Sequence, residues 1–324
     1  MITAAIIIFA VMLALFGITV GVDIYIAKKR NTKYHLRQVI TAFIFLLPAV
    51  IFAFFFVVLP IMYSLGYAFT DYELLTPDET QFVGFKNFAD AFKEIGNGGM
   101  LATALKNTGI FVVLVVPIQI GLALILALFT NVSFKGKAIF KVCFFAPVVV
   151  SLTITSYLWL LLLSPSESGL INSFLGVFGI PPQDFLRNPD TTMLWIVVIS
   201  AWQGAGYQML IFSSALTGIR KDLYEAARLD GCNAWMRFWK VTLPGLKPTL
   251  LYILITVFIG ACRIMVQPML MVGYEERAVT VSYYMYQQGY SFYHVGYSSA
   301  IAFLMTIFIG TITFLQRKLL GEKK

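Results

Sequence analysis

Charged residues are scarce in this sequence. Only 12% of its 324 residues are Asp, Glu, Lys or Arg, whereas 59% are hydrophobic. An ordinary soluble domain carries about twice that share of charge. The composition therefore excludes a soluble globular protein. It predicts an all-α, polytopic membrane protein, because helices satisfy their own backbone hydrogen bonds inside a bilayer.

Cysteine and histidine are also scarce. The three cysteines and two histidines form no cluster, so the sequence predicts neither a disulfide framework nor a metal site. Carboxylates are missing from the predicted spans, with Asp23 near the end of one of them. This disfavours an ion-coupled secondary transporter, which needs acids within the membrane. A membrane-embedded enzyme of lipid or polysaccharide synthesis is disfavoured because it would need clustered acids or histidines.

A Walker A string, G-x-x-x-x-G-K-[ST], does not occur. The segment Ser133–Lys137 supplies lysines without the required spacing, and a phosphate cradle depends on that spacing. We therefore predict that the chain is not an enzyme and has no cofactor of its own. If ATP drives its activity, another chain binds and hydrolyses the nucleotide.

Seven apolar runs are long enough to cross a bilayer. They are residues 2–27, Val39–Tyr67, Gly109–Thr130, Val142–Leu163, Met193–Thr217, Pro248–Met271 and Tyr297–Leu315. The first run is followed, not preceded, by its positive charges, which favours an uncleaved anchor helix over a signal peptide.

The net charge of +8 reflects membrane topology. With the N-terminus outside and the C-terminus inside, 18 of the 24 Lys and Arg residues lie on the inner side. This is the positive-inside rule, so the basic excess does not indicate nucleic acid. The inner-side residues are Lys28, Lys29, Arg30, Lys33, Arg37, Lys135, Lys137, Lys141, Arg220, Lys221, Arg228, Arg237, Lys240, Lys247, Arg317, Lys318, Lys323 and Lys324.

The longest polar interval of the second half is 220–247, between two spans. Asp222 and Glu225 have the spacing of a helix start, with the aspartate as the cap. Asp230-Gly231 predicts a turn, and Leu243-Pro244 predicts the end of a second short helix. The interval is thus expected to be a helix–turn–helix that presents an apolar side to a protein partner.

The same interval resembles the EAA loop of binding-protein-dependent ABC importer permeases. The matching residues are Glu225, Ala226, Ala227, Asp230, Gly231, Phe238, Leu243 and Pro244. In that family the loop docks into a groove of the ATPase subunit. The resemblance implies that Glu225 faces a basic residue of the ATPase and that Gly231 sets the turn. The plainer alternative, compatible with it, is a capping glutamate.

The resemblance implies a type I ABC importer permease of the carbohydrate class, in the bacterial cytoplasmic (inner) membrane. Residues 1–37 would be an anchor helix and a basic inner turn, and 38–324 the permease domain, with its core at about 104–317. The implied partners are a second permease subunit, two ATPase subunits that bind ATP and Mg, an extracytoplasmic solute-binding protein and membrane lipid.

Polar residues within the spans predict the substrate pathway. Gln203 and Tyr207 are four residues apart, as are Arg263 and Gln267, so each pair would share a helix face. Resemblance to the maltose-type permease places Gly204, Tyr207, Arg263, Ile264 and, more loosely, Ser151 near the sugar. The full predicted set is Ser151, Gln203, Gly204, Tyr207, Gln208, Arg263, Ile264 and Gln267.

Arg263 is costly within a membrane, by ~2.5–3.5 kcal/mol on insertion scales. Arginine binds carboxylate or phosphate bidentately, so we predict an anionic carbohydrate. The alternative for Arg263 is that an acid or carbonyls of the partner permease neutralise it. For Gln203 and Tyr207 the alternative is that they only pack helices together. For the substrate the alternative is a sugar phosphate or a neutral oligosaccharide.

Overall fold

The computed structural model describes residues 17, 20–22, 36–132, 134–166 and 169–320. Two units are distinguished, Met1–Tyr67 and Ala68–Lys324, and each is considered by itself. The described residues are almost entirely helical, with two isolated β-bridges, in line with the predicted all-α class.

The first unit contains α2 (Leu36–Ala53), the π-helical turn η1 (Phe54–Val58) and α3 (Leu59–Tyr67). Residues Ile44–Tyr67 are apolar and long enough to cross a membrane, which agrees with the predicted second span. The predicted anchor helix at 2–27 lies almost wholly outside the described residues. The boundary between residues 37 and 38 therefore stays a prediction.

The second unit holds the remaining helices. In chain order they are η2 (Pro77–Glu79), α4 (Lys86–Gly96), α5 (Met100–Asn131), α6 (Lys137–Val149), α7 (Leu152–Leu162), α8 (Leu170–Val177), α9 (Pro189–Gly218), α10 (Lys221–Leu229), α11 (Ala234–Arg237), η3 (Phe238–Thr242), α12 (Leu243–Cys262), α13 (Val266–Met271), α14 (Val281–Tyr286), η4 (Gln287–Ser291) and α15 (Val295–Leu320).

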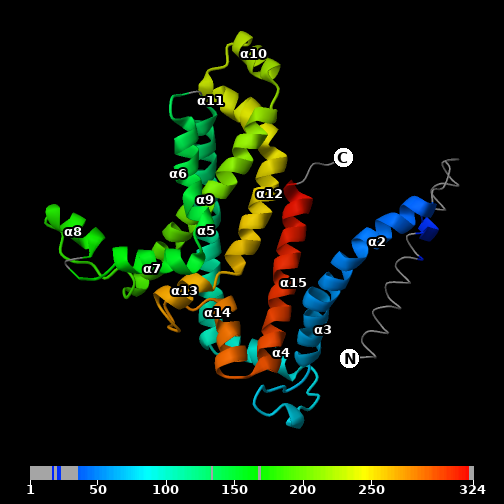
Figure 1. Cartoon of the computed structure of the whole chain (residues 1–324). Coiled ribbons are helices and arrows are strands. Elements are labelled where there is room, and N and C mark those ends of the chain that lie inside the picture. The colour runs from blue at the N-terminus through cyan, green and yellow to red at the C-terminus, as the bar shows by residue number, and fades with distance from the viewer. Residues whose placement is uncertain (1–16, 18–19, 23–35, 133, 167–168, 321–324) are drawn as a thin grey trace. The chain divides into compact units, whose positions relative to one another are not determined.

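The core of this unit lies where α5, α9 and α12 pack together. Helices α5 and α9 run from the end where α4 lies to the end where α10 lies, and α12 runs back (Figure 1). Small residues allow this close packing, as is usual between membrane helices. Ala123 of α5 and Ala205 of α9 are fully buried in the shared core, beside Ile253 of α12.

Five helices of the described residues are long and apolar enough to span a membrane, or six if one bent pair counts as a span. The predicted third, fifth and seventh spans correspond to α5, α9 and α15. The total of seven depends on residues 2–27 and stays a prediction.

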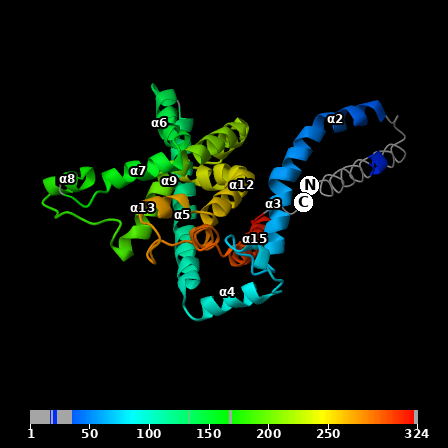
Figure 2. The ribbon, with the colours of Figure 1, turned by 60° about the horizontal axis from the view of Figure 1, so that its bottom comes forward.

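The fourth predicted span, Val142–Leu163, is divided by a break between α6 and α7. Helices α6 and α7 meet at an angle of 101°, and Figure 2 shows α7 and α8 extending away from α5 and α9. Val150 and Ser151 are extended, and the Ser151 hydroxyl accepts the N–H of Ile154, which caps α7. A serine in an apolar run thus starts a new helix instead of continuing the old one.

The sixth span also departs from the prediction. Helix α12 ends at Cys262, Arg263 has non-helical dihedral angles, and α13 begins at Val266. Arg263 and Gln267 therefore do not share a face of one helix, as their spacing predicted.

Leu243-Pro244 does not end the preceding helix, contrary to the prediction. A π-helical turn, η3, leads directly into α12, and the N–H of Leu243 bonds to the carbonyl of Phe238, five residues back. The wider turn relieves the clash between the proline ring and the carbonyl four residues earlier. The same arrangement recurs in the first unit, where η1 precedes Leu59-Pro60.

Glu94 of α4 joins four helices at the α4 end. Its carboxylate accepts the N–H of Leu101 in the first turn of α5, at 3.0 Å, where a negative charge is favourable. It also accepts the hydroxyls of Tyr284 and Tyr297, which belong to α14 and α15. Burial, together with the hydrogen bond to Glu94, raises the pKa of Tyr284 well above its ordinary value. The four helix ends are thereby held together.

Gly206 makes the contact between α9 and α6 possible. A Cβ atom at this position would collide with the carbonyl oxygen of Phe144. We predict that Gly206→Ala lowers stability by about 1–3 kcal/mol through overpacking, measured by thermal unfolding in detergent. Gly121→Ala in α5 is the control, since nothing lies within 4 Å of its added methyl group. Equal melting temperatures for the two variants would contradict the close contact.

Candidate functional site

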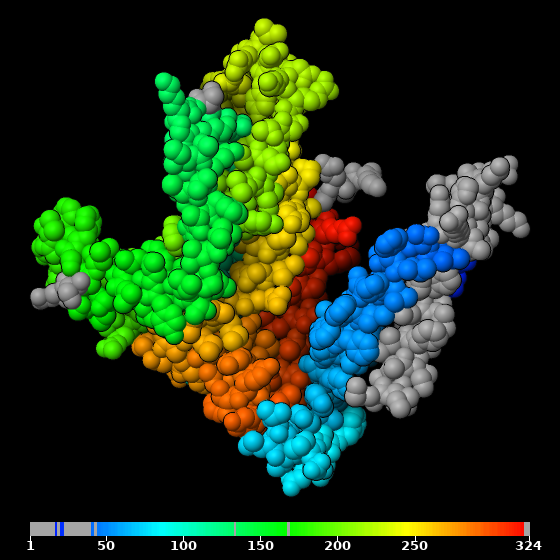
Figure 3. Space-filling model, in the orientation of Figure 1, coloured from blue at the N-terminus to red at the C-terminus, as the bar shows by residue number. Residues whose placement is uncertain are grey.

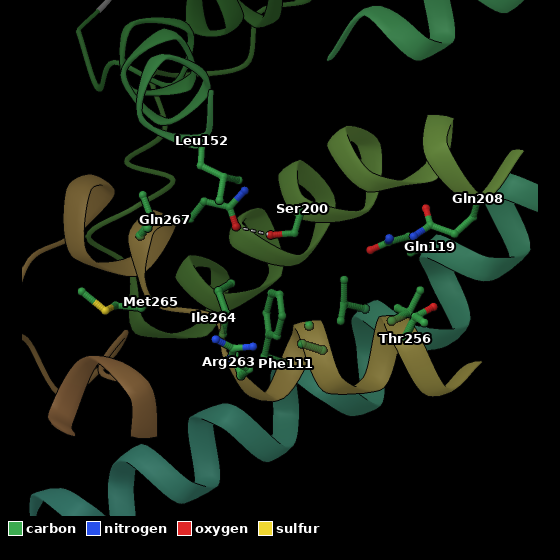
Figure 4. A pocket seen from close by; sticks show the side chains of 15 residues that line it. Phe111, Gln119, Leu152, Ser200, Gln208, Thr256, Arg263, Ile264, Met265 and Gln267 are labelled. Atoms are coloured by element: carbon green, nitrogen blue, oxygen red, sulfur yellow. Dashed lines mark hydrogen bonds between the residues drawn. The ribbon is translucent and has the colours of Figure 1, made fainter. Parts of the chain in front are cut away.

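A cavity of about 420 Å³ lies among α5, α9, α12 and α13. This volume is typical of a small-molecule site. Figure 4 shows its lining from close by. The lining residues are Phe111, Val115, Gln119, Leu152, Ser200, Gln208, Thr256, Val257, Gly260, Ala261, Arg263, Ile264, Met265, Val266 and Gln267.

Arg263 lies at the break between α12 and α13, and its side chain lines the cavity. The residue is exposed, and no described residue forms an ion pair with it. Within the described chain, the predicted alternative of an acid that neutralises Arg263 therefore finds no candidate. The cavity has a free guanidinium at one end.

Four polar side chains form a hydrogen-bonded chain near Arg263. The Ser200 hydroxyl donates to the Oε1 atom of Gln267 at 2.6 Å, and the Nε2 atom of Gln267 donates to Gln203 at 3.3 Å. Gln203 in turn donates to the Thr155 hydroxyl at 3.1 Å and to the Val150 carbonyl at 3.2 Å. The chain ties α9 to α13 and to the break between α6 and α7, so it holds both helix breaks in place.

Four of the eight residues predicted to form the substrate pathway line this cavity. They are Gln208, Arg263, Ile264 and Gln267. The other four lie in different surroundings. Gln203 is buried in the hydrogen-bonded chain, and Tyr207, four residues on, is 49% exposed. Gly204 packs against the amide of Gln119, and Ser151 caps α7. A shared role for Gln203 and Tyr207 stays a prediction.

Four lining residues were not predicted from the sequence: Gln119, Ser200, Thr256 and Phe111. Of these four, only Gln119 carries a signal in the sequence that could have placed it at the site. It is a single polar residue in the apolar run of α5, and a buried amide in a membrane helix needs a partner. Ser200 and Thr256 carry no such signal, since hydroxyls in membrane helices commonly bond to their own helix. Thr256 does bond to the carbonyls of Tyr252 and Ile253.

The second candidate site is the hairpin of α10 and α11 between α9 and α12. Gly231 turns the chain with φ of +75°, as predicted from Asp230-Gly231. The predicted cap at Asp222 is wrong: the helix begins after Arg220, and Asp222 lies inside the first turn. Its carboxylate is paired with the Arg220 guanidinium and accepts the N–H of Leu223.

This hairpin exposes apolar side chains at the end of the unit. Leu229 is 89% exposed and Trp235 67%, and Figure 3 shows the segment standing clear of its neighbours. Inside the hairpin, the Tyr224 hydroxyl bonds to Thr242 at 3.0 Å. Glu225 is exposed and lines a hollow of about 710 Å³ between α10 and the end of α9. The hairpin thus offers a rigid, half-apolar surface.

A third hollow of about 930 Å³ opens at the α4 end, between the starts of α5 and α9 and the loop after α13. It carries charges of both signs, including Lys106, Asp190 and Glu276. Asn107 fixes the loop by donating to the carbonyls of Glu276 and Val279, at 2.7 and 2.9 Å. Burial raises the pKa of the neighbouring Tyr274 to about 12, so this residue stays a neutral hydroxyl at physiological pH.

The profile of the family "binding-protein-dependent transport system inner membrane component" matches residues 110–323. The chain belongs to this family. It is therefore a multi-pass inner membrane component of a transport system that works with a binding protein.

Relatives of this inner membrane component include the arabinooligosaccharide transport permease AraP of Bacillus subtilis, which is 31% identical over 78% of this chain and 80% of AraP. The lactose transport permease LacF of Rhizobium radiobacter is 29% identical over 88% of this chain and 95% of LacF. A solved bacterial alginate ABC transporter, in complex with its alginate-bound periplasmic protein, has a chain of the same fold. The TM-score is 0.78, with 23% identity over 88% of this chain and 96% of that one.

Gln203 gives a test of the hydrogen-bonded chain in this transport component. Gln203→Leu removes the acceptor of the Gln267 Nε2 atom and the donor to the Thr155 hydroxyl, so we predict a loss of about 1–3 kcal/mol of stability, measured by thermal unfolding in detergent. Gln81→Leu is the control, because Gln81 is exposed. A melting temperature for Gln203→Leu as high as that of the control would show that the two helix breaks do not depend on this residue.

Proposed function

We propose that this chain is one transmembrane permease subunit of an ATP-driven importer that moves an anionic carbohydrate across the cytoplasmic membrane. The observation that carries the proposal is the free guanidinium of Arg263 in the cavity among α5, α9, α12 and α13. A cation without a partner in a membrane-embedded cavity is costly unless it binds a ligand of opposite charge. Carboxylate and phosphate are the groups that arginine binds bidentately.

The carbohydrate class is supported by relatives. AraP and LacF are described as permeases for arabinooligosaccharides and lactose, at 31% and 29% identity. The solved alginate importer carries an acidic polysaccharide, but at its level of identity it supports only the fold. The proposal that the substrate is anionic therefore rests on Arg263, whereas the proposal that it is a sugar rests on the relatives.

In this proposal the α10–α11 hairpin is the coupling element. A separate ATPase subunit, present in two copies, would grip the exposed apolar side of the hairpin and pair a basic residue with Glu225. ATP and Mg bind to that subunit, and the permease breaks no bond. A second permease subunit would complete the pathway, because Arg263 in the cavity is exposed in this chain alone.

The α10 end of the unit would face the cytoplasm. Basic residues are concentrated there, at the turn between α5 and α6 and along 220–247, as the positive-inside rule requires. The α4 end, with its mixed-charge hollow of about 930 Å³, would face the solute-binding protein. The N-terminus would then lie outside and the C-terminus inside.

The charge preference can be tested with two sugars of equal length. Aldotriouronic acid, a glucuronate linked to xylobiose, carries a carboxylate, whereas xylotriose is neutral. We expect Arg263→Gln to lower the uptake of the acid relative to the neutral sugar by about tenfold, because one charge-assisted contact is lost. Arg263→Lys keeps the charge and should retain part of the preference.

Uptake is measured in proteoliposomes that contain the complete importer. An unchanged ratio of acidic to neutral uptake in Arg263→Gln, in an importer that still works, would rule out an anionic substrate at this residue. The permease assignment would stand in that case.

The coupling role predicts that Glu225→Lys reduces co-purification of the ATPase subunit at least about tenfold, because a charge reversal in a partly buried contact leaves two cations opposed. The control is Glu79→Lys, an exposed acid in η2 at the opposite end of the unit. Both variants should elute from size exclusion as folded protein in detergent. Normal ATPase recovery with Glu225→Lys would refute the docking role.

A further inference from the structure

The cavity has two groups of polar side chains at different heights along the helices. One, the Arg263 level, contains Arg263 and Ser200, and the other, the amide level, contains Gln119 and Gln208. Figure 4 shows Gln119 and Gln208 lying together at one end of the cavity, with Thr256 near them. Arg263 and Ser200 lie nearer the other end. The two groups belong to one continuous hollow, because all of these residues line it.

The separation of the two levels follows from helix geometry. Gln208 lies eight residues after Ser200 on α9, and Gln119 eight residues after Phe111 on α5. At 1.5 Å per residue, eight residues correspond to about 12 Å. Thr256 belongs to α12, which runs in the opposite direction, and Arg263 follows seven residues later, just after that helix ends. All three helices therefore place the amide level nearer the α10 end.

The two glutamines are buried and have polar groups to spare. Gln208 is 8% exposed, and its Oε1 atom has no hydrogen-bond donor. Gln119 is 9% exposed, and its side chain forms no hydrogen bond with another described residue. The amide of Gln119 lies over Gly204, where a Cβ atom would collide with it. Buried acceptors and donors are normally satisfied, so both amides have hydrogen-bonding groups available to a ligand in the cavity.

The wall between the two levels is apolar. Phe111 and Val115 of α5 are 2% and 1% exposed, and Val257 and Ala261 of α12 are also buried there. A cavity with apolar walls and a few convergent polar groups suits a sugar, whose C–H faces pack on apolar side chains while its hydroxyls bond to amides. An amide both donates and accepts, as a hydroxyl does.

We propose that Gln119 and Gln208 form a second subsite, which binds the hydroxyls of a neutral sugar unit while an acidic unit lies at Arg263. This inference rests on the proposed function and sharpens its substrate class. A ligand that reaches both Arg263 and the two glutamines has at least two monosaccharide units and carries its charge at one end. A single-ring sugar phosphate is too short, so the geometry selects an acidic oligosaccharide.

The test compares uptake of aldotriouronic acid with uptake of free glucuronate by the complete importer in proteoliposomes. Both sugars carry the carboxylate, and only the longer one has neutral units for the amide level. Gln119→Leu and Gln208→Leu should each lower the ratio of trisaccharide to monosaccharide uptake by about tenfold. Gln316→Leu is the matched control, because the Oε1 atom of Gln316 on α15 is also buried and unpartnered but lies outside this cavity.

The binding protein is the same in every assay, so a changed ratio reports the permease. Gln208→Asn keeps the amide on a shorter side chain and should fall between wild type and Gln208→Leu, which separates a lost contact from a folding defect. An unchanged ratio in both leucine variants, in importers that still carry the trisaccharide, overturns the second subsite and leaves the proposed function intact. A wild-type importer that carries neither acidic sugar overturns the anionic substrate of the proposed function.

Discussion

The buried hydrogen bond between Gln203 and Gln267 is the contact on which the arrangement of the cavity depends. Two helices break inside an apolar bundle, at Val150-Ser151 and at Arg263. Each break frees backbone groups that lipid cannot satisfy. At one break Gln203 donates a hydrogen bond to the Val150 carbonyl. Its Oε1 atom accepts a hydrogen bond of 3.3 Å from the Nε2 atom of Gln267, which lies just after the other break. A nonpolar residue at position 203 would remove both the bond to the Val150 carbonyl and the link to Gln267 near Arg263.

Two of the helices that line the cavity, α9 and α12, also lead into the α10–α11 hairpin. Helix α9 carries Ser200 and Gln208 and ends one residue before Ile219, whose side chain packs on Gly245 of α12. Helix α12 carries Thr256 and reaches Arg263 after 20 continuous helical residues. Any force applied to the hairpin therefore acts on the same helices that line the cavity. This continuity gives a direct mechanical path between the proposed ATPase contact and the proposed sugar site.

Proline and glycine have local roles in this bundle that a count of each would not reveal. Pro244 follows a π-helical turn and does not end its helix. Gly204 and Gly206 are two residues apart on α9, yet one accommodates a side-chain amide from α5 and the other a backbone carbonyl from α6. For both glycines the neighbouring helix decides what the residue accommodates. The neighbour comes from a distant part of the sequence.

By itself, the sequence determined the membrane class, the EAA pattern, the turn at Gly231 and most of the apolar helices, because these depend on composition and on short-range spacing. It also marked Arg263, since a charge within an apolar run is conspicuous wherever the chain places it. Only the tertiary structure decided that Gln203 supports a helix break while Gln208 lines the cavity, and that Gln119 belongs with Gln208. Those three glutamines are alike in sequence. Their environments are set by which helix packs opposite each one, and hydrophobic periodicity along a single helix does not contain that information.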